Sequence, residues 1–201
     1  MIYLRNSFFL ALLATLSYFF LDIPITTSIA PHSKEFYPFS KGCTLLIFPP
    51  LYLALPLIGY LISRFKKSRW TFHFFVIFTA QCLSVAFVRV FKVLIGRARP
   101  DIFLKKGIFG FYGFEWNHHF HSFPSGHTMA AFTLATSLSL LFPKGRYLFF
   151  TGATLLSLSR IFLLGHFLSD VIGAAAIALI IGKGVHHLCN HITWRHVNET
   201  A

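Results

Sequence analysis

Residues 70–88 read WTFHFFVIFTAQCLSVAFV, nineteen consecutive positions without Asp, Glu, Lys or Arg. An α-helix needs about 20 predominantly apolar residues to cross the hydrocarbon core of a bilayer. Four cations lie within the six positions that precede the run, at Arg64, Lys66, Lys67 and Arg69. The run is therefore typical of a transmembrane helix that begins at a charged boundary.

The composition of the whole chain favours the same class of protein. Of its 201 residues 55% are hydrophobic, 26 are Phe and only 12% are charged. An average soluble domain has about 25% charged residues. A water-soluble globular domain, a disordered segment and a disulfide-framed secreted module are all disfavoured, and an integral membrane protein is expected.

Five further apolar runs predict an all-α polytopic protein with six transmembrane helices in one domain over residues 1–201. The predicted spans are Ser7–Leu21, Cys43–Ser63, Trp70–Val88, Ser125–Phe142, Tyr147–Leu164 and His166–Gly184. We expect the first span to be retained, because no convincing small-residue cleavage site follows it. The residues from Pro31 to Gly42 are expected to form a polar connection, and Pro49, Pro50 and Pro56 predict a kinked or broken second helix.

The net charge of +12 indicates an anionic partner. Because the chain is so apolar, it offers no soluble face for nucleic acid. The expected partners are a phosphorylated membrane lipid and the bilayer itself. The three cysteines lack metal-ligand spacing and are interpreted as small packed hydrophobes.

Orientation is predicted from the Lys and Arg residues of the connections, which number nine on each side of the membrane. Three of those opposite the termini, Lys92, Arg99 and Arg160, are better explained as substrate ligands, which leaves nine against six. We therefore expect a bacterial inner-membrane protein with cytoplasmic termini and a site that faces the periplasm or exterior.

The first polar cluster at a span end reads KVLIGRARP from Lys92 to Pro100. Lys92 and Arg99 are seven residues apart, which is two helical turns, so both would share a face if the third helix continued that far. A pair of cations that extends to the headgroup boundary is the alternative interpretation.

The second cluster, from Pro124 to His127, lies where the fourth apolar run begins. Ser125 is a favoured N-cap residue, and the free N–H groups of a helix start form an anion site that Gly126 lets a ligand approach. His127 would lie beside that anion. A capped helix start without any ligand is the alternative.

The third cluster contains Ser159, Arg160, His166 and Asp170. His166 and Asp170 are four residues apart, on one face of the predicted sixth helix, and ionisable groups at membrane depth are usually paired or functional. An Asp that binds one imidazole nitrogen leaves the other as a nucleophilic lone pair. The alternative is a structural pair of Arg160 with Asp170 beside an uninvolved His166.

Together, the spacings K-x6-RP, PSGH and SR-x5-H-x3-D resemble the three-part signature of the type 2 phosphatidic acid phosphatase (PAP2) superfamily. The eleven matching positions are Lys92, Arg99, Pro100, Pro124, Ser125, Gly126, His127, Ser159, Arg160, His166 and Asp170. The resemblance covers about Lys92 to Asp170 and implies a helical bundle of the PAP2 and haloperoxidase type.

The resemblance also implies roles for these residues. His166 would attack phosphorus to form a phosphohistidine, Asp170 would orient its ring, and His127 would protonate the leaving oxygen and later activate water. The residues implied to bind the phosphoryl group are Lys92, Arg99, Arg160, Ser125 and Gly126. No metal or other cofactor is implied, because three side-chain cations neutralise the charge that Mg²⁺ neutralises elsewhere.

The implied activity is hydrolysis of a lipid phosphate, with several substrates left open. They are lipid A 1-phosphate, a polyprenyl diphosphate such as undecaprenyl pyrophosphate, phosphatidylglycerophosphate and phosphatidic acid. Phosphoryl transfer to a second lipid would use the same residues. A small anion transporter would explain the cations but not the pair of His166 and Asp170, and haloperoxidase chemistry is disfavoured because those proteins are larger and soluble.

A separate group of histidines, His118, His119 and His121, lies in the long connection before the second cluster. These residues could bind zinc, but Glu115 is the only fourth ligand nearby. They are more simply interpreted as lining a headgroup pocket or facing water.

Overall fold

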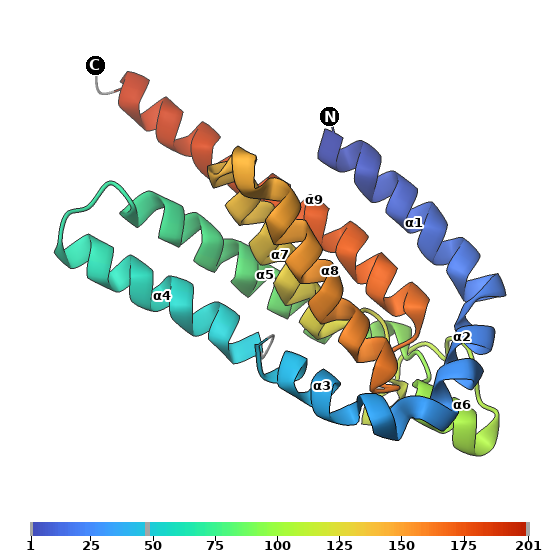
Figure 1. The fold of residues 1–201 in the computed structure, drawn as a ribbon. Coiled ribbons are helices and arrows are strands. Elements are labelled where there is room, and N and C mark those ends of the chain that lie inside the picture. The colour runs from blue at the N-terminus through green and yellow to red at the C-terminus, as the bar shows by residue number, and fades with distance from the viewer. Residues whose placement is uncertain (1, 47–48, 200–201) are drawn as a thin grey trace.

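The computed structural model describes residues 2–46 and 49–199, and over these residues the chain is helical without a β-strand (Figure 1). The α-helices are α1 (Ile2–Phe20), α2 (Asp22–Ile29), α3 (Ser33–Leu46), α4 (Pro49–Phe65), α5 (Thr71–Ile95), α6 (Pro100–Lys106), α7 (Gly126–Leu141), α8 (Arg146–Phe162) and α9 (Leu168–Glu199). Short 3-10 turns lie at Ala30–His32, His118–Phe120 and Pro143–Gly145. The predicted all-α class is confirmed.

The long helices run roughly along one direction: these are α1, α4, α5, α7, α8 and α9 (Figure 1). Helix α7 packs against α5, α8 and α9. Helix α1 lies along α9. The N-terminus and the C-terminal end of α9 lie at one end of this bundle, whereas α2 and α6 lie at the other end. The long connection between α5 and α7 is therefore gathered at the end remote from the termini.

Helix lengths agree with most of the predicted spans. Within residues 2–46 and 49–199, three helical segments are long and apolar enough to cross a membrane, namely Ile2–Phe20, Thr71–Ile95 and Leu168–Ile192, and Pro50–Phe65 is a shorter apolar helix. The fourth and fifth predicted spans coincide with α7 and α8. Six crossings stay a prediction.

Two expectations about the chain before α5 need correction. The stretch from Pro31 to Gly42, expected as a polar connection, is helical throughout and forms the end of a 3-10 turn and most of α3. The second predicted span covers the end of α3 and most of α4, and its residues 47–48 lie outside the described residues. Pro56 lies inside α4 and Pro49 begins it, as suits a residue without an N–H donor.

The interior of the bundle is built from small and hydrogen-bonded side chains. Ala174 and Ala178 of α9 pack with Met129 of α7 and Val88 of α5. Large apolar side chains instead face outward, as Phe65 does with 86% of its surface exposed. Small residues at helix contacts and large apolar ones outside are typical of helices packed in lipid.

Several polar groups between the helices are paired. The Ser84 and Thr133 hydroxyls are 2.7 Å apart between α5 and α7, and the Gln81 Nε2 group donates to the Ala130 carbonyl at 3.0 Å. Such bonds satisfy groups that could find no water in hydrocarbon.

Gly96 ends α5 and starts the connection that forms the site. Its φ of +55° is in the left-handed region, and its N–H closes the last turn on the Lys92 carbonyl. A Cβ atom here would lie 2.0 Å from the Gly113 carbonyl oxygen. Glycine is therefore required both by the backbone angle and by the close approach of the returning chain.

We predict that Gly96→Ala lowers the thermal unfolding midpoint of the detergent-solubilised protein much more than Gly107→Ala does. Both residues have positive φ, which costs an alanine about 1–2 kcal/mol. Only at Gly96 would the new methyl group also meet backbone, because nothing lies within 4 Å of a Cβ at Gly107. Equal shifts for the two variants would contradict this account of the turn.

Candidate active site

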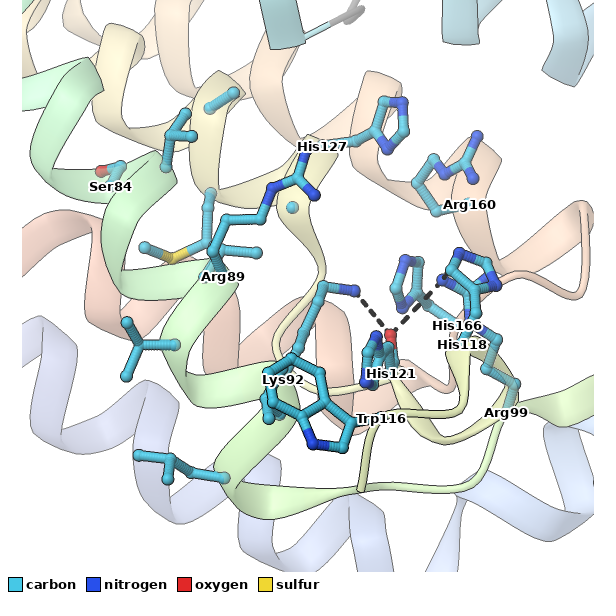
Figure 2. Close-up of a pocket in the computed structure, with 18 residues that line it drawn as sticks. Ser84, Arg89, Lys92, Arg99, Trp116, His118, His121, His127, Arg160 and His166 are labelled. Atoms are coloured by element: carbon cyan, nitrogen blue, oxygen red, sulfur yellow. Dashed lines mark hydrogen bonds between the residues drawn. The ribbon is translucent and has the colours of Figure 1, made fainter. Parts of the chain in front are cut away.

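The three sequence clusters converge on one cavity of about 910 Å³ at the end of the bundle remote from the termini (Figure 2). Six of the eight proposed site residues line it: Lys92, Arg99, Gly126, His127, Arg160 and His166. Ser125 and Asp170 are fully buried behind the wall and do not line it. Residues that lie as far apart in the sequence as Lys92 and His166 thus line the same cavity.

Lys92 and Arg99 reach the cavity from different elements. Lys92 is in the last turn of α5, which ends at Ile95. Arg99 lies beyond that helix, directly before α6. The helix thus does not continue as far as Arg99, and the condition for a shared helical face is not met. Their proximity comes from a common acceptor, since the Lys92 Nζ group donates to the His121 carbonyl at 2.6 Å and the Arg99 Nη2 group donates to the same oxygen at 3.4 Å (Figure 2).

Backbone hydrogen bonds hold the returning connection against residues 96–99. The Arg99 N–H donates to the His119 carbonyl at 3.0 Å, and the Ser122 N–H donates to the Arg97 carbonyl at 3.0 Å. The Tyr112 N–H donates to the Gly96 carbonyl at 3.0 Å. These bonds place the histidine-rich segment at the edge of the cavity.

The three neighbouring histidines have separate partners. His118 Nε2 lies 3.3 Å from Arg99 Nη2, His119 Nδ1 lies 3.2 Å from Asp101 Oδ2, and His121 Nε2 donates to the Glu115 carbonyl at 2.8 Å. In the described ranges, no three His, Cys, Asp or Glu side chains are grouped to hold a metal ion.

His118 and Arg99 are electrostatically coupled outside the helical spans. The Arg99 guanidinium, assisted by burial, lowers the pKa of His118 below its ordinary value. Burial likewise lowers the pKa of Arg99. The uncharged form of His118 is therefore favoured on this wall of the cavity.

The second cluster begins α7, as expected, but Ser125 does not cap it with its side chain. Its hydroxyl accepts a hydrogen bond from Thr128 Oγ1 at 3.0 Å, and its N–H donates to the Asp170 carbonyl at 3.4 Å. Gly126 and His127, in the first turn, form the part of the cluster at the cavity wall.

The third cluster is arranged around the turn between α8 and α9. Arg160 is in the last turn of α8, its carbonyl accepts the Gly165 N–H at 3.1 Å, and His166 follows in the same turn. Because α9 begins at Leu168, His166 precedes the helix on which it was expected to lie. Its side chain still lines the cavity, with 3% of its surface exposed.

His166 lies close to Asp170, with 3.7 Å between Nδ1 and Oδ2. This separation exceeds a hydrogen bond, and the Nδ1 atom has no hydrogen-bond partner among the described residues. Burial lowers the pKa of this imidazole, in the loop before α9, well below its ordinary value. The ring is therefore neutral at pH 7, and with Nδ1 toward Asp170 its Nε2 is the nitrogen left for a ligand. Such contacts often shorten only when substrate binds.

Sequence reasoning missed the cation that pairs with Asp170. Arg97, which is 1% exposed, forms ion pairs with both Asp170 and Asp22. Asp170 also accepts hydrogen bonds from the Ser122 hydroxyl at 2.6 Å and the Phe167 N–H at 2.8 Å. A signal for Asp22 was present, because it is one of only six acidic residues and directly follows an apolar run.

The fold and the site together define a membrane protein of one superfamily. The sequence model of the PAP2 superfamily matches residues 69–194, and the chain belongs to that superfamily. Among solved structures it is similar to the crystal structure of a transmembrane PAP2-type phosphatidylglycerolphosphate phosphatase from Bacillus subtilis, with a TM-score of 0.60 and 22% identity over 96% of this chain and 98% of that one. This similarity confirms the predicted fold of an integral membrane protein.

Two curated relatives carry the same name. The chain is 31% identical over 175 residues to the lipid A 1-phosphatase of Rhizobium johnstonii, which covers 80% of this chain and 70% of the relative. It is 38% identical over 100 residues to the lipid A 1-phosphatase of Rhizobium etli. The second match covers 50% of this chain and 43% of that relative, so it spans less than half of the relative's length.

We predict that Arg97→Met lowers the free energy of unfolding in detergent by about 3–5 kcal/mol, because it leaves two buried carboxylates without their cation. Arg89→Met is the control, since Arg89 also lines the cavity but is exposed. Its effect should stay within about 0.5 kcal/mol. Equal unfolding curves for the two variants would show that the buried pairs do not stabilise the fold.

Proposed function

We propose that this protein is a metal-independent phosphatase that hydrolyses a phosphate monoester or diphosphate of a membrane lipid. The observation that carries the proposal is the convergence of three cations, Lys92, Arg99 and Arg160, with the imidazoles of His127 and His166 around one cavity. A phosphoryl group needs cations around its equatorial oxygens, a nucleophile in line with the leaving group and an acid for that group. The cavity offers side chains for each requirement.

The cations would bind the phosphoryl oxygens and neutralise the charge that develops in the transition state. Lys92 and Arg99 are already held together by the His121 carbonyl, so little reorganisation is needed when an anion binds. The Gly126 N–H at the start of α7 adds a backbone donor, and Ser125 supports this turn from behind the wall.

In the first step, the Nε2 lone pair of neutral His166 attacks phosphorus, and the bond from phosphorus to the lipid oxygen breaks. His127, which must enter this step as the protonated imidazolium, gives its proton to that oxygen and becomes neutral, and Asp170 stabilises the positive charge on the phosphorylated ring. In the second step, water attacks phosphorus while His127 takes its proton, and the bond from phosphorus to Nε2 breaks. Inorganic phosphate leaves and both imidazoles regain their starting protonation states.

The 1-phosphate of lipid A is the substrate that we propose. The names of the two curated relatives support this choice. The remaining cavity wall is largely apolar, with Val85, Val88, Leu94 and Met129 beside the cations, which suits a lipid phosphate rather than a free sugar phosphate. We propose a bacterial inner-membrane location, with cytoplasmic termini and the cavity at the periplasmic or outer face, as the excess of cations near the termini indicates.

The purified protein should release inorganic phosphate from lipid A faster than from undecaprenyl pyrophosphate, phosphatidylglycerophosphate or phosphatidic acid in matched detergent micelles.

EDTA should leave the rate unchanged, because side-chain cations neutralise the phosphoryl charge in place of a metal ion. Vanadate should inhibit, because it mimics five-coordinate phosphorus. Preference for another lipid would reassign the substrate, and loss of activity in EDTA would indicate a required metal.

His166→Ala should abolish phosphate release while vanadate binding falls much less, since the cations remain. Rapid quenching of the wild type with ³²P-labelled lipid should trap label on protein, and the variant should trap none. An anion transporter would instead keep most of its flux in the variant. Label that passes to a second lipid rather than to water would identify a phosphotransferase with the same site.

A further inference from the structure

The junction of α1 and α2 reaches the rear of the site, although it lies outside residues 69–194 that match the family. We propose that Asp22, at this junction, is a positioning residue for the reaction: through Arg97 and Ser169 it holds Asp170 and His166 in their working arrangement. This inference rests on the proposed phosphatase function.

Asp22 is fully buried, and its carboxylate accepts hydrogen bonds at both oxygens. Oδ1 accepts the Ser169 N–H at 2.9 Å and the Ser17 hydroxyl at 3.2 Å. Oδ2 accepts the Ser169 hydroxyl and Arg97 Nη2, each at 2.5 Å. Both oxygens of this buried carboxylate therefore have donors, as a buried polar group requires.

Arg97 connects this carboxylate to the one beside His166. Its Nη2 group binds Asp22, while its Nη1 group binds Asp170 and, at 2.8 Å, the Ser169 hydroxyl. Four aromatic rings surround the guanidinium with centroids 5.0 to 6.0 Å from its carbon, those of Tyr18, Phe109, Phe111 and Phe167. A cation that binds two carboxylates and is surrounded by four rings has little freedom to shift.

The two carboxylates also bind the backbone that follows His166. Asp170 accepts the Phe167 N–H at 2.8 Å, and Asp22 accepts the Ser169 N–H, both at the start of α9. The free N–H groups of a helix start need such acceptors, and carboxylates are favoured there. Asp22 therefore fixes the backbone three residues after the proposed nucleophile.

The charges of the buried group add a second contribution. Asp22, Arg97 and Asp170 together carry a net charge of −1 close to His166, whose ring gains positive charge when it attacks phosphorus. Removal of the Asp22 charge would leave this group neutral and favour the resting ring over the phosphorylated one. The effect should therefore fall on the chemical step rather than on binding of the phosphate, because Lys92 and Arg99 bind the His121 carbonyl and not Asp22.

The test compares Asp22→Asn with Ser7→Ala in the full-length protein. Ser7 is a matched control because it is also buried and also binds α9 from the N-terminal part of the chain, through a 2.6 Å hydrogen bond from its hydroxyl to the Ala176 carbonyl, at a place remote from Asp22. We expect kcat per folded molecule to fall about 10- to 100-fold in Asp22→Asn, with KM and inhibition by inorganic phosphate within about twofold of wild type. Ser7→Ala should keep the wild-type kcat.

Ser169→Ala provides a second variant in case Asp22→Asn does not fold. It keeps the N–H that binds Asp22 but removes the hydroxyl shared by Asp22 and Arg97, and kcat should fall several-fold at unchanged KM. Unchanged kcat in the folded variants, equal losses in Asp22→Asn and Ser7→Ala, or a rise in KM alone would overturn the positioning role. A wild-type protein that hydrolyses none of the four lipids would instead refute the proposed function, and this inference with it.

Discussion

The fold depends on a guanidinium that has been removed from water. A buried cation is costly unless anions and hydrogen bonds replace its hydration, and Arg97 meets this requirement with Asp22 and Asp170. The two acids come from the first and last fifths of the chain. Their common cation therefore requires the α1–α2 junction, the residues after α5 and the start of α9 to lie together, at the end of the bundle where the cavity is found.

The cations on the cavity side lie near one another. Lys92, Arg99 and Arg160 line one space, and like charges at such a place repel one another unless an anion lies among them. The neighbouring cations lower the pKa of His118, so its uncharged form is favoured beside them. Arg97 is paired with two carboxylates behind the cavity wall, whereas Lys92, Arg99 and Arg160 line the cavity itself. One region of the chain thus supplies both a structural cation and cations of the proposed binding site.

The surrounding helices use two kinds of side chain for two environments. Small residues such as Ala174 and Ala178 let α9 approach α7 and α5, and hydroxyl pairs such as Ser84 with Thr133 satisfy polar groups between helices. Large apolar side chains, among them Phe8 and Phe65, are exposed to the surroundings of the bundle. Since lipid tails are as apolar as these side chains, close packing rather than exclusion of water holds such helices together.

Local sequence determined the helical class, most helix positions and the three clusters, because apolar runs of a given length and short motifs need only neighbouring residues. It placed His166 on a helix that begins only at Leu168, and it interpreted the segment that forms most of α3 as a polar connection. Only the tertiary structure showed that Arg97, and not merely the signature residues, pairs with Asp170, and that Asp22 shares that cation. The physical reason is that the pairing of buried charges depends on which distant segments exclude water together, and no local pattern records that.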